Sequence, residues 1–158
     1  MTSTDEQPRV LVVVGPTAVG KTALAVQVAQ RLGGEIVGTD SMQAYRGMVI
    51  GTAAPTLPDL QGVRHHMLQV WPIDRMVTVM EFQAAARAVI TDIAARGRLP
   101  IVVGGSGLYV SAVLDDLNFP PTDPDMRAHF ERQLAKLGAR GLHCLLYTSP
   151  SPRDATLS

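Results

Sequence analysis

The chain carries a phosphate-binding pattern close to its start, in the eight consecutive residues Gly15, Pro16, Thr17, Ala18, Val19, Gly20, Lys21 and Thr22. Glycines at both ends of this pattern let backbone N–H groups turn toward an anion. Lys21 adds a positive charge, and the hydroxyl of Thr22 can reach a Mg²⁺ ion bound to the phosphates. These residue types predict that a phosphorylated ligand binds here, and they leave its reaction open.

The segments on either side of this loop are those that the mechanism requires. Residues 9–14 form a short apolar, β-branched run, which is typical of a buried parallel strand. Residues 22–32 carry apolar side chains at helical spacing and stop at two glycines. A strand, a glycine loop and a helix in this order place helical N–H groups against the bound anion.

Strands and helices continue to alternate along the chain, which predicts an α/β protein with a parallel sheet flanked by helices. The predicted sheet is like that of phosphate-loop nucleoside triphosphatases, with the start of a helical insertion after it and an incomplete C-terminal end. We expect further strands at residues 35–40, 64–71 and 99–105, and further helices at residues 78–96, 106–117 and 124–137.

Composition narrows the class of protein. The chain has 158 residues, is 46% apolar and 18% charged, and has no net charge, so it is globular and shows no overall basic field. It contains no apolar run long enough to cross a membrane, and its polar, acidic start is unlike a signal peptide. Its single cysteine cannot form an internal disulfide. These features predict a cytoplasmic enzyme.

Three further sites have residues of chemical interest. Asp40 follows the second predicted strand, where it could be a general base, a magnesium ligand or a cap for the next turn. The strand at 99–105 ends in two glycines and Ser106, without the acidic residue that many nucleotide hydrolases use. His65 and His66 are adjacent and point in different directions, so we expect structural roles for them and no metal site.

Four segments, "GPTAVGKT", "DSMQAYRGMVIGTAAP", "GVRHHML" and "GGSGLYV", closely resemble the amino-terminal half of the bacterial tRNA dimethylallyltransferase family in their order and spacing. The resemblance covers about residues 9–143. It implies transfer of a dimethylallyl group from dimethylallyl diphosphate to the exocyclic amine of the adenosine 3′ to the tRNA anticodon. The phosphate loop would then hold the diphosphate with Mg²⁺, and no phosphoryl group would be transferred.

The resemblance also implies roles for individual residues. Asp40 matches the general base, Thr17 an additional donor to the diphosphate, and Ser106 a position near donor and base. Gln43 is expected to hydrogen-bond a flipped-out adenine bidentately. The residues implied in catalysis are Thr17, Lys21, Asp40 and Ser106, those implied in tRNA binding are Asp40, Ser41, Met42, Gln43, Ser106 and Arg127, and Thr22 is the implied magnesium ligand.

Three alternatives stay open from the sequence: a small-molecule kinase that uses the same loop for ATP, an adenylate prenyltransferase, and an inactive binding fragment. We expect residues 118–143 to begin a helical insertion that contacts tRNA. Residues 144–158 resemble a translated sequencing adaptor, so we expect the natural protein to continue beyond residue 143. We also expect the intact protein to be a monomer. The 158-residue chain alone is expected to be poorly soluble or inactive.

Overall fold

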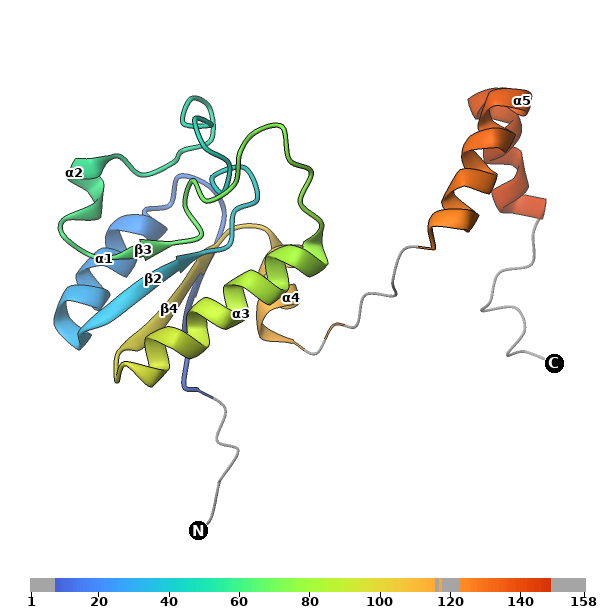
Figure 1. The fold of residues 1–158 in the computed structure, drawn as a ribbon. Helices are drawn as coiled ribbons and strands as arrows, with labels where there is room; N and C mark the ends of the chain where they lie inside the picture. Colours follow the sequence, from blue (N-terminus) through green and yellow to red (C-terminus); the bar gives the residue numbers. More distant parts are fainter. Residues whose placement is uncertain (1–7, 116, 118–122, 149–158) are drawn as a thin grey trace, which may run out of the picture. The chain divides into compact units, whose positions relative to one another are not determined.

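The computed structural model describes residues 8–115, 117 and 123–148 in two separate units, which comprise residues 1–117 and 118–158 (Figure 1). The first unit is a four-stranded sheet in the order β1-β4-β2-β3, and all neighbouring strands are parallel. This arrangement confirms the predicted α/β class. The strands are β1 (Leu11–Val14), β2 (Gly34–Gly38), β3 (His65–His66) and β4 (Leu99–Gly104), and the helices are α1 (Lys21–Leu32), α2 (Leu57–Leu60), α3 (Val79–Ala95) and α4 (Gly107–Leu114).

Helices cover both faces of this sheet through two hydrophobic clusters. On one face, α1 packs against Ile36 and Ile101 from the central strands. On the other face, α3 and α4 pack against Val37 and Val102, with Phe82 in the centre of the cluster. The alternation of side chains along each strand therefore supplies apolar residues to both faces, as a doubly covered parallel sheet requires.

The strand β1 differs from the fully buried strand that its sequence predicts. Leu11 and Val13 pack against the α1 cluster, but Val12 is 38% exposed and Val14 is 59% exposed. The reason is its position, because β1 pairs only with β4 and forms an edge among the described strands. A β-branched run reports strand propensity, and it does not report how many neighbours the strand has.

The described residues of the second unit form one helical element, α5 (Pro124–Thr148), which is interrupted at Gly138. Its start agrees with the helix expected from residue 124, and Asp123 Oδ1 caps it by accepting hydrogen bonds from the backbone nitrogens of Asp125 at 2.9 Å and Met126 at 3.1 Å. The helix was expected to end at residue 137, but it resumes after Gly138 and runs to Thr148. No helix in the described part of the chain is long and apolar enough to span a membrane.

Close packing at the end of β4 gives a first testable prediction. A Cβ atom added to Gly104 would overlap the hydroxyl of Thr39 and lie 2.9 Å from Cγ2 of Val110 in α4. Thr39 is buried and its hydroxyl donates to the carbonyl of Val103 at 3.2 Å, so it cannot move away freely. We expect Gly104→Ala to destabilise the protein by about 1–3 kcal/mol in chemical unfolding. Gly107→Ala, where a Cβ atom meets nothing within 4 Å, is the control; equal losses in both variants would contradict this packing.

A buried carboxylate ties the sheet to the end of α3. Glu35 in β2 is 3% exposed and receives a paired hydrogen bond from the guanidinium of Arg96, one of whose contacts is 2.9 Å. His66 Nε2 lies 2.7 Å from the same carboxylate, and Arg98 Nε lies 3.5 Å from it. The Arg96 hydrogen bond is the main cause that lowers the pKa of Glu35 from 4.5 to about 2, while burial opposes it.

This lowered pKa makes stability depend on pH in a defined direction. The unfolded chain takes up a proton on Glu35 near pH 4.5, whereas the folded chain does so only near pH 2. The stabilisation is therefore complete above about pH 4.5 and is lost as the pH falls toward 2. We expect Glu35→Gln to lose up to about 3 kcal/mol at pH 7 and progressively less below pH 4.5. Unfolding measured from pH 7 to pH 3 tests this, and a difference between the two proteins that is independent of pH would refute it.

Candidate active site

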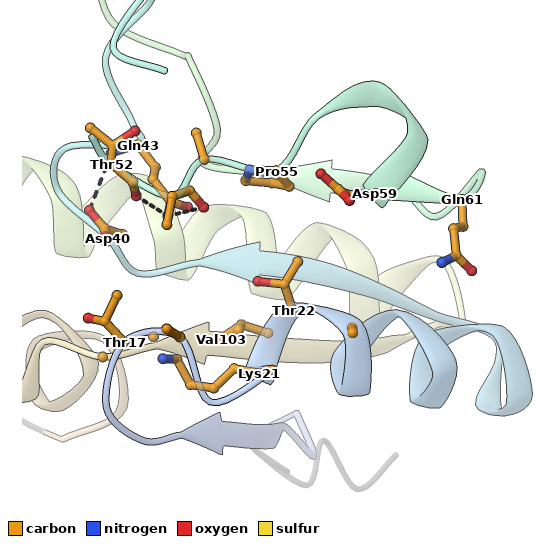
Figure 2. Close-up of a pocket in the computed structure, with 17 residues that line it drawn as sticks. Thr17, Lys21, Thr22, Asp40, Gln43, Thr52, Pro55, Asp59, Gln61 and Val103 are labelled. Carbon is orange, nitrogen blue, oxygen red and sulfur yellow. Dashed lines mark hydrogen bonds between the residues drawn. The ribbon is translucent and has the colours of Figure 1, made fainter. Parts of the chain in front are cut away.

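A cavity of about 460 Å³ lies where the carboxyl ends of β1, β2 and β4 meet. Open α/β sheets bind their ligands at this edge. Figure 2 shows side chains of the phosphate loop on one side of the cavity and side chains of the segment after β2 on the other. The lining residues are Thr17, Ala18, Gly20, Lys21, Thr22, Ala23, Asp40, Gln43, Thr52, Ala53, Ala54, Pro55, Asp59, Gln61, Val103, Gly104 and Gly105.

The phosphate loop has the backbone geometry that its glycines predict. Gly20 adopts a left-handed conformation, with φ of 87°, directly before the first residue of α1. Ala18 is also left-handed, with φ of 66°, which side chains rarely allow. The loop thus curves around the start of α1, where free N–H groups and the helix dipole favour an anion.

Lys21 lies across this loop and close to the end of β4. Its Nζ donates a hydrogen bond to the carbonyl of Pro16 at 2.6 Å. A Cβ atom added to Gly105 would lie 3.2 Å from the carbonyl oxygen of Gly15 and 3.6 Å from Lys21 Nζ. The glycine after β4 therefore allows the loop backbone and the lysine amine to approach closely, which a side chain would hinder.

Asp40 faces the cavity from the segment that follows β2. Its Oδ1 accepts hydrogen bonds from the backbone nitrogens of Met42 at 2.9 Å and Gln43 at 3.3 Å. These bonds form an Asx-type turn, which is the capping role that the sequence offered as one alternative. They occupy one carboxylate oxygen, and Asp40 still lines the cavity, so capping and chemistry at the second oxygen are compatible.

Gln43 is arranged differently from the expected bidentate adenine contact. Its Nε2 donates to the carbonyl of Thr52 at 2.9 Å and to that of Ala53 at 3.2 Å. Both amide protons are therefore used to hold the following loop, and the side-chain oxygen alone is available for a ligand. A bidentate contact would require these two bonds to break, whereas acceptance of one hydrogen bond from an exocyclic amine would not.

The structure separates the expected site residues into two groups. The first group lines the cavity together and consists of Thr17, Ala18, Gly20, Lys21, Thr22, Asp40 and Gln43. Ser106 occupies the N-cap position of α4 without a side-chain capping hydrogen bond and does not line the cavity, and Arg127 belongs to the second unit. The other expected residues that do not line it are Gly15, Pro16, Val19, Ser41 and Met42.

Sequence reasoning assigned no role to a second part of the cavity wall. This part is formed by Asp59 in α2, by Gln61 directly after α2, and by the preceding residues Thr52, Ala53, Ala54 and Pro55. Periodicity could not indicate these residues, since their segment is held by the Gln43 hydrogen bonds and by the capping interactions of Asp59 with Thr56. The long motif "DSMQAYRGMVIGTAAP" ends at residue 55, so it includes residues 52–55 and is the one sequence signal that pointed to them, whereas Asp59 and Gln61 lie beyond it.

The oxygen atoms around the cavity fit a magnesium ion bound mainly through its ligand. Magnesium in phosphate sites takes one or two protein oxygens and completes its shell with phosphate oxygens and water. Thr22 supplies a hydroxyl and Asp40 a carboxylate to this cavity, whereas the Asp59 carboxylate, which also lines it, is engaged by Thr56. Among the described residues there is no group of three or more His, Cys, Asp or Glu side chains that would form an all-protein metal site.

The two adjacent histidines have separate surroundings, as their sequence predicts. His66 belongs to the Glu35 network. His65 Nδ1 lies 2.9 Å from the carbonyl oxygen of Val63, and burial is the main cause that lowers the pKa of His65 below its usual value. Its other ring nitrogen, Nε2, is buried without a hydrogen-bond partner among the residues that the structure describes.

Comparison with known proteins gives consistent matches. A family model described as IPP transferase matches residues 43–153. Among curated proteins, tRNA dimethylallyltransferase of Parafrankia sp. (strain EAN1pec) is 56% identical over 142 residues, which are 90% of this chain and 45% of that protein. The corresponding protein of Acidothermus cellulolyticus is 53% identical over 146 residues, which cover 92% and 46% of the two chains. The chain spans about half the length of the curated relatives it matches.

Solved structures agree with these matches. The full-length tRNA isopentenylpyrophosphate transferase of Bacillus halodurans superposes with a TM-score of 0.68 at 41% identity, over 96% of this chain and 51% of that one. A eukaryotic dimethylallyltransferase, crystallised in a study of its action on tRNA, gives a TM-score of 0.70 at 29% identity, over 79% and 32% of the two chains.

Proposed function

The chain belongs to the IPP transferase family, and we propose that its site forms the donor-binding and catalytic part of a tRNA dimethylallyltransferase. The reaction would move a dimethylallyl group from its diphosphate to the exocyclic amine of the adenosine 3′ to the anticodon, with release of diphosphate. The observation that carries this proposal is the pairing of a phosphate loop with Asp40 across one cavity. That cavity can hold a diphosphate and an acceptor base together.

The residues on the loop side suit a diphosphate leaving group. As the allylic C–O bond breaks, negative charge grows on the diphosphate, and preorganised donors aimed at this charge lower the barrier. Lys21 and the N–H groups at the start of α1 are such donors, and Thr17 lines the same wall. When bound at Thr22, Mg²⁺ would neutralise part of the charge on the diphosphate oxygens.

The residues on the opposite side suit an adenine acceptor. The exocyclic amine is a weak nucleophile, and a carboxylate that accepts its proton as the new C–N bond forms lowers the barrier. Asp40 can accept that proton at the oxygen that its turn leaves open. Gln43 can accept a hydrogen bond from the same amine through its side-chain oxygen, so the two residues would bracket the reacting nitrogen of a flipped-out base.

Activity assays require the part of the family that this chain does not span. For these assays we define an extended enzyme, which is this chain joined to the region of the Parafrankia tRNA dimethylallyltransferase that follows the part matched by this chain. We expect it to prenylate an unmodified tRNA transcript, detected as a dimethylallyl-adenosine nucleoside after digestion. A transcript with guanosine at the acceptor position is the matched control and should stay unmodified. Prenylation of free AMP with no tRNA product would point instead to the adenylate prenyltransferase alternative.

A further inference from the structure

A second, smaller cavity lies beside the active-site cavity and shares residues with it. Its volume is about 30 Å³, and Thr22, Asp40 and Gln43 line both spaces. Pro55 and Val103 also line both spaces. The rest of the small cavity is mostly apolar and is lined by Ile36, Gly38, His65, His66, Met67 and Leu68. A space of this volume with several polar groups can hold one ordered water molecule.

The contact of His65 with the Val63 carbonyl determines which ring nitrogen of His65 carries the proton. A carbonyl oxygen can only accept a hydrogen bond, so the Nδ1 atom that lies 2.9 Å from Val63 must carry the ring proton. In the neutral ring, Nε2 is then an acceptor. This acceptor is buried and has no partner within the described part of the chain. An unpaired buried acceptor is costly, which indicates that a donor occupies the small cavity.

We propose that one buried water in the small cavity links His65 to the active site, and that His65 is thereby a positioning residue for Thr22. The water donates to His65 Nε2 and to the Asp40 carboxylate, and it accepts from the Thr22 hydroxyl. Three hydrogen bonds are typical of a buried water. The Thr22 proton is thus directed toward the small cavity, and its lone pairs are directed toward the magnesium-bound diphosphate. This inference rests on the proposed function for the identity of that ligand.

The direction of the hydroxyl matters because a metal ligand must present a lone pair and not a proton. Removal of a group that orients a metal ligand typically lowers metal affinity or activity 10- to 100-fold. His65 can set this direction because β3 pairs with β2 in register, with His65 opposite Ile36, and this pairing fixes the backbone of the histidine. The neighbouring His66 also lines the small cavity, but its Nε2 lies 2.7 Å from the Glu35 carboxylate and so already has a partner.

The test measures binding of inorganic pyrophosphate by calorimetry, with and without Mg²⁺, so it needs neither tRNA nor turnover. Three variants of the extended enzyme separate the two ring nitrogens of His65. His65→Gln places an acceptor near the Nε2 position, His65→Asn keeps a donor toward Val63 but no acceptor there, and His65→Phe has neither. His66→Asn is the matched control, because His66 also lines the small cavity but its Nε2 contacts Glu35 and is not an open acceptor.

We expect His65→Asn and His65→Phe to weaken Mg²⁺-dependent pyrophosphate binding about tenfold, with Mg²⁺-free binding unchanged. His65→Gln should restore most of the affinity, and His66→Asn should lower thermal stability without this Mg²⁺-specific loss. The proposal is overturned if His65→Asn binds magnesium pyrophosphate like the parent protein. It is also overturned if the Gln variant is as impaired as the Phe variant. If the variants bind pyrophosphate as expected but the extended enzyme does not prenylate tRNA, the proposed function is refuted instead.

Discussion

Asp40→Asn should lower kcat of the extended enzyme by about 10²- to 10⁴-fold, which is the usual contribution of a general base. The substitution is a clean test because asparagine keeps an Oδ1 atom. The two backbone hydrogen bonds from Met42 and Gln43 can therefore persist, and the turn that holds the cavity wall should survive. The change removes the negative charge and the ability to accept a proton at the second oxygen.

The measurement is single-turnover prenyl transfer to a saturating tRNA transcript. Asp59→Asn is the matched control, since Asp59 lines the same cavity but its Oδ2 accepts hydrogen bonds from Thr56 at 2.8 and 2.6 Å. We expect this control to stay within about tenfold of the parent, which is well below the loss expected from a general base. If Asp40→Asn keeps a rate similar to that of Asp59→Asn, Asp40 is not the base.

Lys21→Met should lower kcat/KM for dimethylallyl diphosphate by about 10²- to 10³-fold, as expected for one lost donor to a developing anion. Methionine retains an unbranched stem of similar length, so the loop should pack as before while the charge is lost. The KM for tRNA should change little, because Lys21 lies on the phosphate side of the cavity, opposite Asp40 and Gln43 (Figure 2).

Steady-state rates with the donor varied at saturating tRNA give this value. Lys136→Met, which removes an exposed lysine from α5 in the second unit, is the control for loss of one positive charge. The assignment of Lys21 to the diphosphate would be wrong if both variants lost the same factor, or if the Lys21 variant changed only the KM for tRNA.

The sequence predicted best those features that local patterns determine. The helix expected at residues 78–96 is observed at Val79–Ala95, because Thr78 and Glu81 form a capping box that a reader can see in the sequence. The loop before α1 was also recognisable, since its glycines and lysine occur at fixed spacing between a strand and a helix. These signals need no information about distant residues.

Features that depend on distant contacts were less predictable. The wall at residues 52–55 takes its position from Gln43, and Tyr45 accepts a hydrogen bond from the backbone nitrogen of Val77 at 3.1 Å. Both contacts join segments that have no shared periodicity. The exposure of Val14 likewise depends on which strands lie beside β1, and the acceptor left open at His65 depends on a cavity formed by five separate segments. The origin of residues 144–158 stays a prediction.

The central claim is that the phosphate loop holds a leaving diphosphate and that the carbon group is what moves. Dimethylallyl diphosphate labelled with ¹⁴C in the allyl group and ³²P in the diphosphate tests it most directly, with the extended enzyme and an unmodified tRNA transcript. We predict that ¹⁴C appears in the tRNA and that an equal amount of ³²P appears as free pyrophosphate. The claim would be contradicted if ³²P were transferred to an acceptor. It would also be contradicted if no ¹⁴C entered the tRNA while a parallel reaction with labelled ATP transferred its terminal phosphate.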